Sequence, residues 1–350
     1  MINRAVLLAN LGSPDAPEVP AVRKYLKQFL MDPYVIQLPW LLRALIVNLL
    51  VLPKRPYKSS EAYRSIWTVE GSPLVHRSHE LLKALKPKVE LPVAMAMRYG
   101  TPSIESQIKS LVANDGNGGI DEILFIPLYP HYADSTVTTS IKEAERVIRA
   151  YNLPVKLQTL LPFYDDKAYI DALVNSAAAG LSEDYDHILF SYHGLPELHI
   201  TKADPTGSHC LKSKSCCSLS SPSSAHATCY RHQVLRTTEC FVQKTGLSSE
   251  QYTVAYQSRL GRAKWLEPST EDTLIKLARQ GKKKILVLCP AFVTDCLETL
   301  EEIDIQGRET FLAAGGEELT YIPCLNDNDD WVECLSAWIK TYPLITSTAQ

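Results

Sequence analysis

The chain alternates short apolar runs with polar loops and amphipathic segments. Apolar residues recur at helical spacing, as at Val22, Leu26 and Leu30, and predict helices over 19–30, 76–85, 171–181 and 268–280. The short apolar runs predict buried strands over 5–9, 93–99, 123–128, 155–161, 188–190, 252–256 and 285–289. Strand, polar loop and helix therefore alternate along the chain, which is typical of a doubly wound parallel sheet.

The alternating pattern restarts near residue 158. At 350 residues the chain is long enough for two domains of ordinary size. We expect an α/β fold of two similar Rossmann-like halves with a cleft between them, one half over 1–158 and the other over 159–345. No repeat of the sequence itself accompanies the shared pattern.

Composition narrows the function classes. Apolar residues make up 45% of the chain and charged residues 21%, as in globular proteins. The 36 basic and 39 acidic residues give a net charge of −3 without a basic block, which argues against a nucleic-acid partner. The segment from Met1 to Arg4 leads directly into the first predicted strand with no secretory signal, so we expect a cytoplasmic location.

The first candidate for chemistry is His193. The apolar run over 188–190 is followed by Ser191, Tyr192, His193 and Gly194, so an imidazole stands where a buried strand ends. Ligands of open parallel sheets bind at that edge, because the loops leaving it line a crevice. The alternative is a capping or core histidine whose nitrogens are bonded locally.

Other predicted strands also end in polar or aromatic side chains. The first is followed by a loop that contains Leu11 and Ser13 but lacks the glycine spacing of a dinucleotide fingerprint. The second ends in Arg98 and Tyr99, and the third leads into a polar loop that contains Tyr132. These strand ends are candidate substrate contacts.

Three carboxylates follow the strand over 285–289. On a helix, Asp295, Glu298 and Glu302 would form one stripe at i, i+3 and i+7, with Leu297, Leu300 and Ile303 on the opposite face. Such a stripe suits the transfer of protons or of a hydrated cation. The alternative is the solvated side of an amphipathic helix, with acids favoured near its N-terminus.

The longest apolar run covers residues 38–53. It is too short to span a bilayer and contains Arg43 and Asn48. It fits an amphipathic segment on a membrane surface, the apolar lip of a pocket, or an ordinary core helix.

Four of the nine cysteines crowd into a serine-rich insert over 204–230: Cys210, Cys216, Cys217 and Cys229. In a cytosolic protein such crowding favours a metal over a disulfide framework. Four thiolates suffice for a 2Fe-2S cluster or a structural zinc. The adjacent pair Cys216 and Cys217 does not match a zinc-ribbon spacing, so a 2Fe-2S cluster is the preferred interpretation.

Six motifs together resemble those of ferrochelatases, in the same order and over nearly the whole chain. They are NLGSP, AMRYGTPSI, IPLYPHYADSTV, SYHGLP, YQSRLGRAKWLEPST and CPAFVTDCLETLEEID. The resemblance implies insertion of ferrous iron into protoporphyrin IX, the step that completes haem, with the macrocycle held between the two halves. It implies protoporphyrin and ferrous iron as partners.

Residue by residue, the resemblance assigns the catalytic histidine to His193 and the catalytic glutamate to Glu298. It places Asp295 and Glu302 on an acidic path for protons or metal. Its pocket positions match Arg98, Tyr99, Tyr132 and Trp265, which join Leu11 and Ser13 as expected substrate contacts. The chain departs from many relatives at Cys296, where they have histidine, and at Glu301, where an aromatic residue is common.

The chemistry of the implied reaction gives His193 two alternative roles, base for the pyrrole protons or first ligand to the metal. Glu298 is then a relay or a co-ligand, and both residues are expected to contact the substrate iron. The resemblance also implies an internal 2Fe-2S cluster with a structural or sensing role. The run over 38–53 matches the family's pocket lip and favours transient, peripheral contact with the inner membrane.

Two rival functions follow from the same residues. One is a chelatase for another tetrapyrrole, such as coproporphyrin or sirohydrochlorin, although the apolar lip over 38–53 favours protoporphyrin. The other is a non-catalytic iron-sulfur or haem-binding sensor. The presence of both His193 and Glu298 argues against a sensor.

Overall fold

The computed structural model describes residues 3–113, 119–218, 222–259 and 263–343. The chain divides into two compact units. The first comprises Met1–Tyr129, Asp134–Leu161 and Asp327–Gln350, and the second comprises Pro130–Ala133 and Pro162–Asn326. Each unit contains one four-stranded sheet with only parallel pairs.

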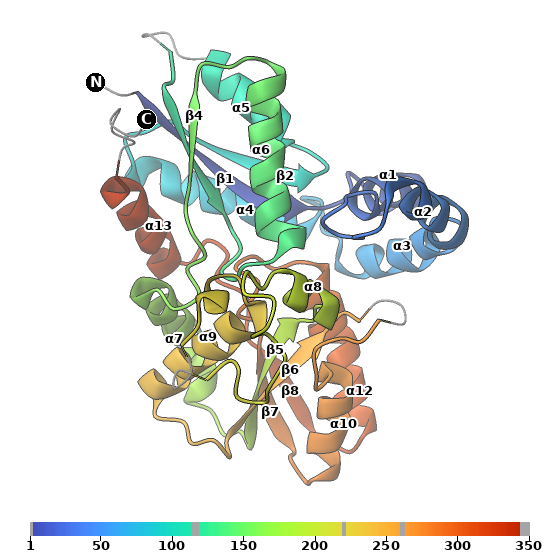
Figure 1. Ribbon diagram of the computed structural model, residues 1–350. Helices are drawn as coiled ribbons and strands as arrows, with labels where there is room; N and C mark the ends of the chain where they lie inside the picture. The colour runs from blue at the N-terminus through green and yellow to red at the C-terminus, as the bar shows by residue number, and fades with distance from the viewer. Residues whose placement is uncertain (1–2, 114–118, 219–221, 260–262, 344–350) are drawn as a thin grey trace. The chain divides into compact units, whose positions relative to one another are not determined.

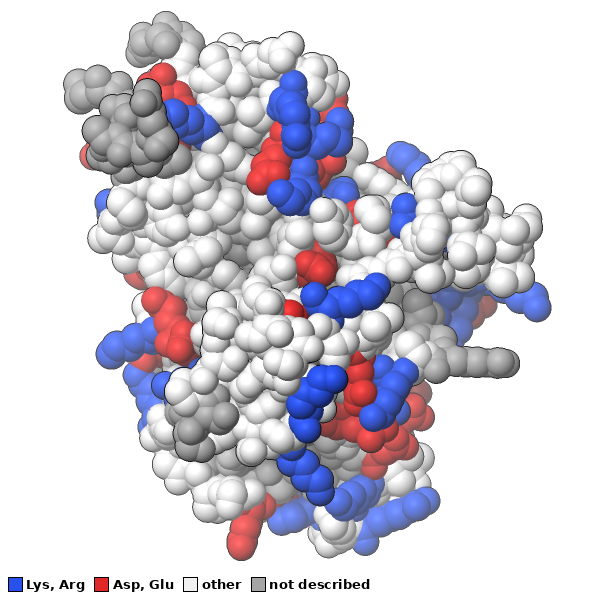
Figure 2. All heavy atoms as spheres, viewed as in Figure 1, with Lys and Arg blue, Asp and Glu red and all other residues white. Residues whose placement is uncertain are grey.

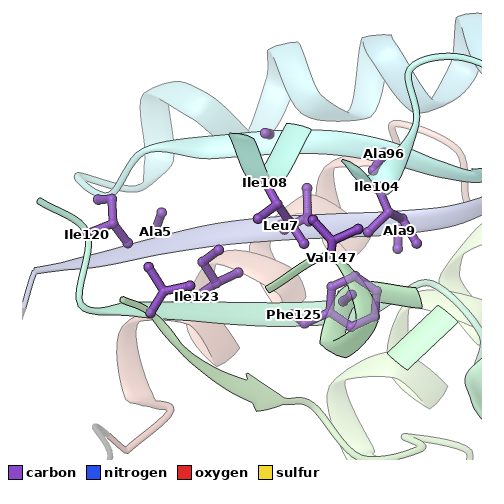
Figure 3. Close-up of a cluster of buried hydrophobic side chains, with 13 residues drawn as sticks. Ala5, Leu7, Ala9, Ala96, Ile104, Ile108, Ile120, Ile123, Phe125 and Val147 are labelled. Atoms are coloured by element: carbon purple, nitrogen blue, oxygen red, sulfur yellow. The ribbon is translucent and has the colours of Figure 1, made fainter. Parts of the chain in front are cut away.

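The first unit is built on a sheet of order β2-β1-β3-β4 (Figure 1). Its strands are β1 (Arg4–Gly12), β2 (Val93–Tyr99), β3 (Glu122–Pro127) and β4 (Lys156–Thr159). Helices α5 (Ile104–Ala113) and α6 (Thr139–Ala150) cover one face, and side chains such as Leu7, Ile108 and Phe125 form the core between helices and strands (Figure 3). A π-helical turn, η3 (Asp134–Thr138), leads into α6. Helix α4 (Pro73–Leu85) packs against α13 (Asp329–Thr341). A 3-10 turn, η2 (Lys86–Lys88), follows α4.

Between β1 and α4 the chain forms a helical lobe. Its elements are α1 (Val19–Leu30), α2 (Trp40–Leu45), the π-helical turn η1 (Ile46–Val51) and α3 (Arg55–Ile66). The lobe has a small core of its own around Leu30, Val47 and Leu52.

The second unit repeats the topology with the order β6-β5-β7-β8. Its strands are β5 (His187–His193), β6 (Tyr252–Gln257), β7 (Lys284–Leu288) and β8 (Glu318–Tyr321). Its helices are α7 (Lys167–Leu181), α8 (Glu197–Lys202), α9 (Tyr230–Thr245), α10 (Thr270–Arg279), α11 (Leu297–Thr299) and α12 (Arg308–Ala313). A 3-10 turn, η4 (Ser224–Ala227), lies before α9, and a π-helix, η5 (Leu300–Gly307), joins α11 to α12.

The predicted fold class is confirmed: the chain has two Rossmann-like α/β halves. The helix over 19–30 and the strand over 93–99 have the predicted bounds. Asn10, Leu11 and Gly12 belong to β1 rather than to the predicted loop, because the pairing with β2 continues to the register pair Gly12 and Tyr99. Among the described helices, none has the length and apolarity needed to cross a membrane.

Candidate active site

The strand β5 places His193 at its carboxyl end, as predicted. The chain then turns sharply, and the Gly194 N–H donates to the Gln257 carbonyl at 2.7 Å. A Cβ at Gly194 would lie 2.8 Å from that carbonyl oxygen and 3.3 Å from the ring of Trp265. Glycine is therefore required for this close approach, which also brings Trp265 beside the end of β5.

The imidazole of His193 is half-buried and held in one tautomer. Its Nδ1 lies 2.6 Å from the Gly194 carbonyl oxygen, which can only accept, so Nδ1 carries the hydrogen. The lone pair of the neutral ring is then on Nε2. The Tyr230 hydroxyl donates to the His193 carbonyl at 2.8 Å and the Phe292 ring centre lies 6.3 Å from the imidazole centre, which fixes the surroundings of the ring.

The predicted stripe of three carboxylates on one helix is wrong in its first member. Helix α11 begins at Leu297, with Cys296 in extended conformation as its N-cap, so Asp295 precedes the helix. The π-helical turns of η5 also change which side faces inward: Thr299, Ile303 and Gly307 are buried, whereas Leu297 and Leu300 are half-buried. Glu298 and Glu302 remain four residues apart on the continuous helical segment.

The carboxylate of Asp295 is buried and fully hydrogen-bonded. It accepts from the Tyr321 hydroxyl at 2.5 Å, from the Cys324 N–H at 3.1 Å and from the Asn326 side-chain amide at 2.7 Å. These bonds join the segment after β7 to the last residue of β8 and to the segment that follows it. This arrangement suits a structural carboxylate.

Glu302 is also anchored. Its carboxylate accepts from the Ser258 N–H at 2.7 Å, from the Ser258 hydroxyl, and from the Gln257 side-chain amide at 3.3 Å. The half-buried carboxylate of Glu298 has no such N–H or hydroxyl donor among the described residues, and the Cys296 thiol is its hydrogen-bonding neighbour. Burial, with Glu298 as a further cause, raises the pKa of the Cys296 thiol well above its ordinary value.

Gln257 links the strand that carries the imidazole to the helical segment that carries the glutamate, although sequence reasoning did not single it out. It pairs with His193 in the register of β5 and β6. Its side-chain amide donates to the Glu298 carbonyl at 2.6 Å. The predicted association of His193 with Glu298 in one unit thus has a direct structural link.

The remaining predicted contacts in the second unit are Trp265 and Tyr132. Trp265 forms a β-bridge with Pro196, just after the turn that contains Gly194. The Tyr132 N–H donates to the Gln233 side-chain carbonyl at 2.7 Å. Both residues keep their assignment as predicted substrate contacts.

In the first unit, Arg98 and Tyr99 are bound to a buried carboxylate. Asp32 accepts from Arg98 at 2.5 Å, from the Tyr99 hydroxyl at 3.0 Å and from the Thr139 hydroxyl at 2.6 Å. Burial, the largest cause, raises the pKa of Tyr99. The sequence pattern did not reveal Asp32, because it lies far along the chain from β2.

Leu11 and Ser13 lie beside these residues in the first unit. A Cβ at Gly100 would lie 2.5 Å from the Ser13 carbonyl oxygen, so the two strand ends are in close contact. Leu11 is half-buried, and the buried Ser13 hydroxyl has no hydrogen-bond partner among the described residues. A buried hydroxyl without a partner suits a ligand contact, and Leu11 and Ser13 stay predicted substrate contacts.

The four cysteines of the insert form one buried group. Their thiols are not in disulfides, and the Cys216 and Cys217 sulfurs lie 3.8 Å apart. Hydrogen bonds, chiefly from Cys217, lower the pKa of Cys229, which favours the thiolate form of this residue. Within the described ranges, no group of three or more His, Cys, Asp or Glu side chains is arranged to hold a metal ion.

Donors surround the adjacent pair of cysteines. The Arg231 guanidinium lies 3.8 Å from both the Cys216 and the Cys217 sulfur. His226 lies 2.9 Å from the Cys216 carbonyl oxygen and His232 lies 3.0 Å from that of Cys217, so each ring donates to the backbone carbonyl of one of the two cysteines. A cationic, donor-rich shell suits thiolates that carry negative charge.

Comparisons with known proteins decide the family. The model of the family described as Ferrochelatase matches residues 3–342. The chain belongs to the ferrochelatase family. It is 55% identical to the ferrochelatase of Stutzerimonas stutzeri over 336 residues (96% of this chain and 97% of the relative). It is 54% identical to that of Pseudomonas fluorescens strain Pf0-1 (98% and 99%) and 52% identical to that of Azotobacter vinelandii (97% and 99%).

A solved structure shows the same fold. SirB from Bacillus subtilis, determined with Fe3+, matches with a TM-score of 0.53 at 11% identity, covering 97% of this chain and 95% of SirB. At that identity the likeness concerns the fold alone. The predicted ferrochelatase membership is confirmed by the family match, and the rival functions are not favoured.

Proposed function

We infer that the chain carries out its family's reaction, the insertion of ferrous iron into protoporphyrin to form haem, with His193 and Glu298 at the reacting centre. The chain is an enzyme of the ferrochelatase family, and that membership carries the reaction itself. The observation that supports the two residues is Gln257, which joins the strand of His193 to the backbone of Glu298.

The reaction requires a proton acceptor beside the metal. Two pyrrole N–H protons leave the macrocycle as one ferrous ion enters, so the product is haem and two protons are released. The Nε2 lone pair of His193 can accept a proton or bind the iron first, because Nδ1–H donates to the Gly194 carbonyl. Glu298 acts from the same unit as relay or co-ligand.

The Glu298→Gln variant tests the glutamate. The carboxamide keeps the shape of the side chain but cannot take up a proton, so we expect kcat to fall about 100- to 1,000-fold. Porphyrin affinity, measured by fluorescence quenching, should stay within about twofold of the wild-type value. Glu301→Gln on the same helical segment is the matched control and should retain activity. Wild-type kcat in Glu298→Gln would remove Glu298 from the mechanism.

The second proposal concerns the insert: Cys210, Cys216, Cys217 and Cys229 bind a 2Fe-2S cluster. Such a cluster takes four cysteine thiolates, and these four are buried, reduced and adjacent to Arg231. The donor chemistry therefore fits the cluster. A cluster with four protein ligands has no open coordination position, so its role is structural or sensing.

Anaerobic purification tests the cluster. We expect iron and acid-labile sulfide in equal amounts in the wild-type protein, and loss of both in Cys217→Ser. Cys240→Ser, which changes a cysteine of α9 outside the insert, should keep them. Colourless wild-type protein without sulfide, or with zinc, would contradict the proposal.

The third proposal is peripheral membrane contact through residues 38–53. Leu41, Leu49 and Leu50 are 73%, 65% and 66% exposed, which is unusual for leucine. The Arg43 side chain turns inward and donates to the carbonyls of Ile36 at 3.2 Å and Leu38 at 2.8 Å. The exposed side of α2 and η1 is therefore apolar, and Figure 2 shows this lobe largely in white.

Co-sedimentation with anionic phospholipid vesicles tests the contact. The double variant Leu41→Glu/Leu49→Glu should lose most of the bound fraction. Leu312→Glu, at an exposed leucine of α12, should bind as the wild type does. Equal binding by all three proteins would contradict the proposal. The cytoplasmic location and the acidic path through Asp295 and Glu302 stay predictions.

A further inference from the structure

Gln257 is the last residue of β6 and is 3% exposed. It stands beside His193 in the register of the parallel pair, so its backbone shares the geometry of the strand that carries the imidazole. The Gly194 N–H, which comes directly after His193, donates to the Gln257 carbonyl at 2.7 Å. The main chains on both sides of the imidazole are thus fixed to Gln257.

The side-chain amide of Gln257 is fully used. Its carbonyl oxygen accepts from the Ser191 hydroxyl of β5 at 2.7 Å. Its NH2 group has two hydrogens and donates to the Glu298 carbonyl at 2.6 Å and to the Glu302 carboxylate at 3.3 Å. A buried amide with every position bonded holds its partners at fixed separations.

Ser258 extends the link by one residue. Its φ of +66° places it in the left-handed region, which serine seldom occupies. This conformation accompanies the contact of both its N–H and its hydroxyl with the Glu302 carboxylate. Strained backbone of this kind persists where the surrounding structure holds it, and it often marks functional sites.

We propose that Gln257 is a positioning residue that sets Glu298 against His193, with Glu302 as the anchor of the helical segment. The inference rests on the proposed roles of His193 and Glu298. The Glu298 main chain is held by Gln257, and the helical segment is held one turn later through Glu302. The Glu298 carboxylate stays available for chemistry because the anchoring bonds go to its own carbonyl and to Glu302.

Two substitutions at Gln257 separate the hydrogen bond from simple packing. Gln257→Leu deletes the donor, and Gln257→Glu replaces it with an acceptor that faces Glu302. We expect kcat to fall about 10- to 100-fold in both, because small displacements of reacting groups are costly. Porphyrin affinity should stay within about twofold, since the Gln257 side chain is buried and its hydrogen bonds go to protein groups.

The pH profile is the decisive readout. Below the pKa of the introduced carboxyl group, protonation restores one donor, so the deficit of Gln257→Glu should narrow several-fold from pH 8 to pH 6. The deficit of Gln257→Leu should not change with pH. Identical profiles for the two variants, or wild-type kcat in either, would overturn the inference.

Ser258→Gly keeps the test available if the Gln257 variants do not fold. Glycine adopts a positive φ without strain, so the variant should fold while losing one donor to Glu302. We expect kcat to fall about threefold to tenfold at unchanged porphyrin affinity. Gln243→Glu on the exposed side of α9 is the control for the same chemical change and should be fully active. Wild-type kcat in Ser258→Gly would contradict the role of Glu302 as the anchor.

If Glu298→Gln is inactive while the Gln257 and Ser258 variants are fully active, the inference fails and the proposed function stands.

Discussion

The two sheets have the same topology, but the polar residues at their carboxyl ends are used differently. In the first unit, Arg98 and Tyr99 are both bound to the buried Asp32. In the second unit, the one side-chain hydrogen bond of His193 among the described residues goes through Nδ1, which leaves the lone pair of Nε2. A strand end thus becomes a candidate reacting centre only where a titratable atom is left without a structural partner.

The largest effect on stability is expected for Asp32, which binds the two residues at the end of β2. Asp32→Ala removes the acceptor of Arg98, Tyr99 and Thr139 and leaves a largely buried guanidinium without its partner. We expect the free energy of unfolding to fall by about 3–5 kcal/mol in urea titrations. Glu145→Ala, which breaks an exposed pair with Lys142, should cost less than about 1 kcal/mol. Similar losses in the two variants would contradict the structural role of Asp32.

The next prediction distinguishes a structural carboxylate, Asp295, from the candidate catalytic carboxylate, Glu298, in the second unit. Asp295→Ala leaves the Tyr321 hydroxyl, the Cys324 N–H and the Asn326 amide without their acceptor, so the free energy of unfolding should fall by about 2–4 kcal/mol. Glu298→Gln should change it by less than about 0.5 kcal/mol. Thermal and urea unfolding of both variants checks this division. A large loss of stability in Glu298→Gln would mean that Glu298 is structural as well.

A smaller effect is expected at His131, which is buried, whereas His193 is half-buried. Burial lowers the pKa of His131 to about 3. The unfolded chain takes up this proton near pH 6.5, whereas the folded chain resists it until the pH approaches 3, so stability is fully present above pH 6.5 and is lost as the pH falls toward 3. The free energy of unfolding should therefore fall by about 2 kcal/mol between pH 6.5 and pH 5.

The His131→Gln variant isolates that contribution. It removes the titrating ring and keeps a donor for the Thr237 hydroxyl, which lies 2.8 Å from His131 Nε2. The free energy of unfolding should then depend less on pH between 6.5 and 5 than it does in the wild type. Parallel pH profiles for the two proteins would show that His131 is not buried in its neutral form.

Local sequence patterns predicted the strands, the fold class and the position of His193, because each depends on a short run of residues. The apolar run over 188–190 and Gly194 were enough to place the imidazole at a strand end. Asp32 and Gln257 were missed, since their partners lie far away in the sequence. The helical stripe was misplaced because a pattern of i, i+3 and i+7 assumes an α-helix that already includes Asp295, whereas Cys296 caps the helix and π-helical turns follow.

The most direct measurement is single-turnover insertion of ferrous iron into protoporphyrin by His193→Ala, followed under anaerobic conditions by haem absorbance. We expect a rate constant at least about 100-fold below the wild-type value, with porphyrin affinity retained, because the acceptor lone pair of Nε2 is lost. A wild-type rate constant in a folded His193→Ala protein would contradict the central role of this imidazole.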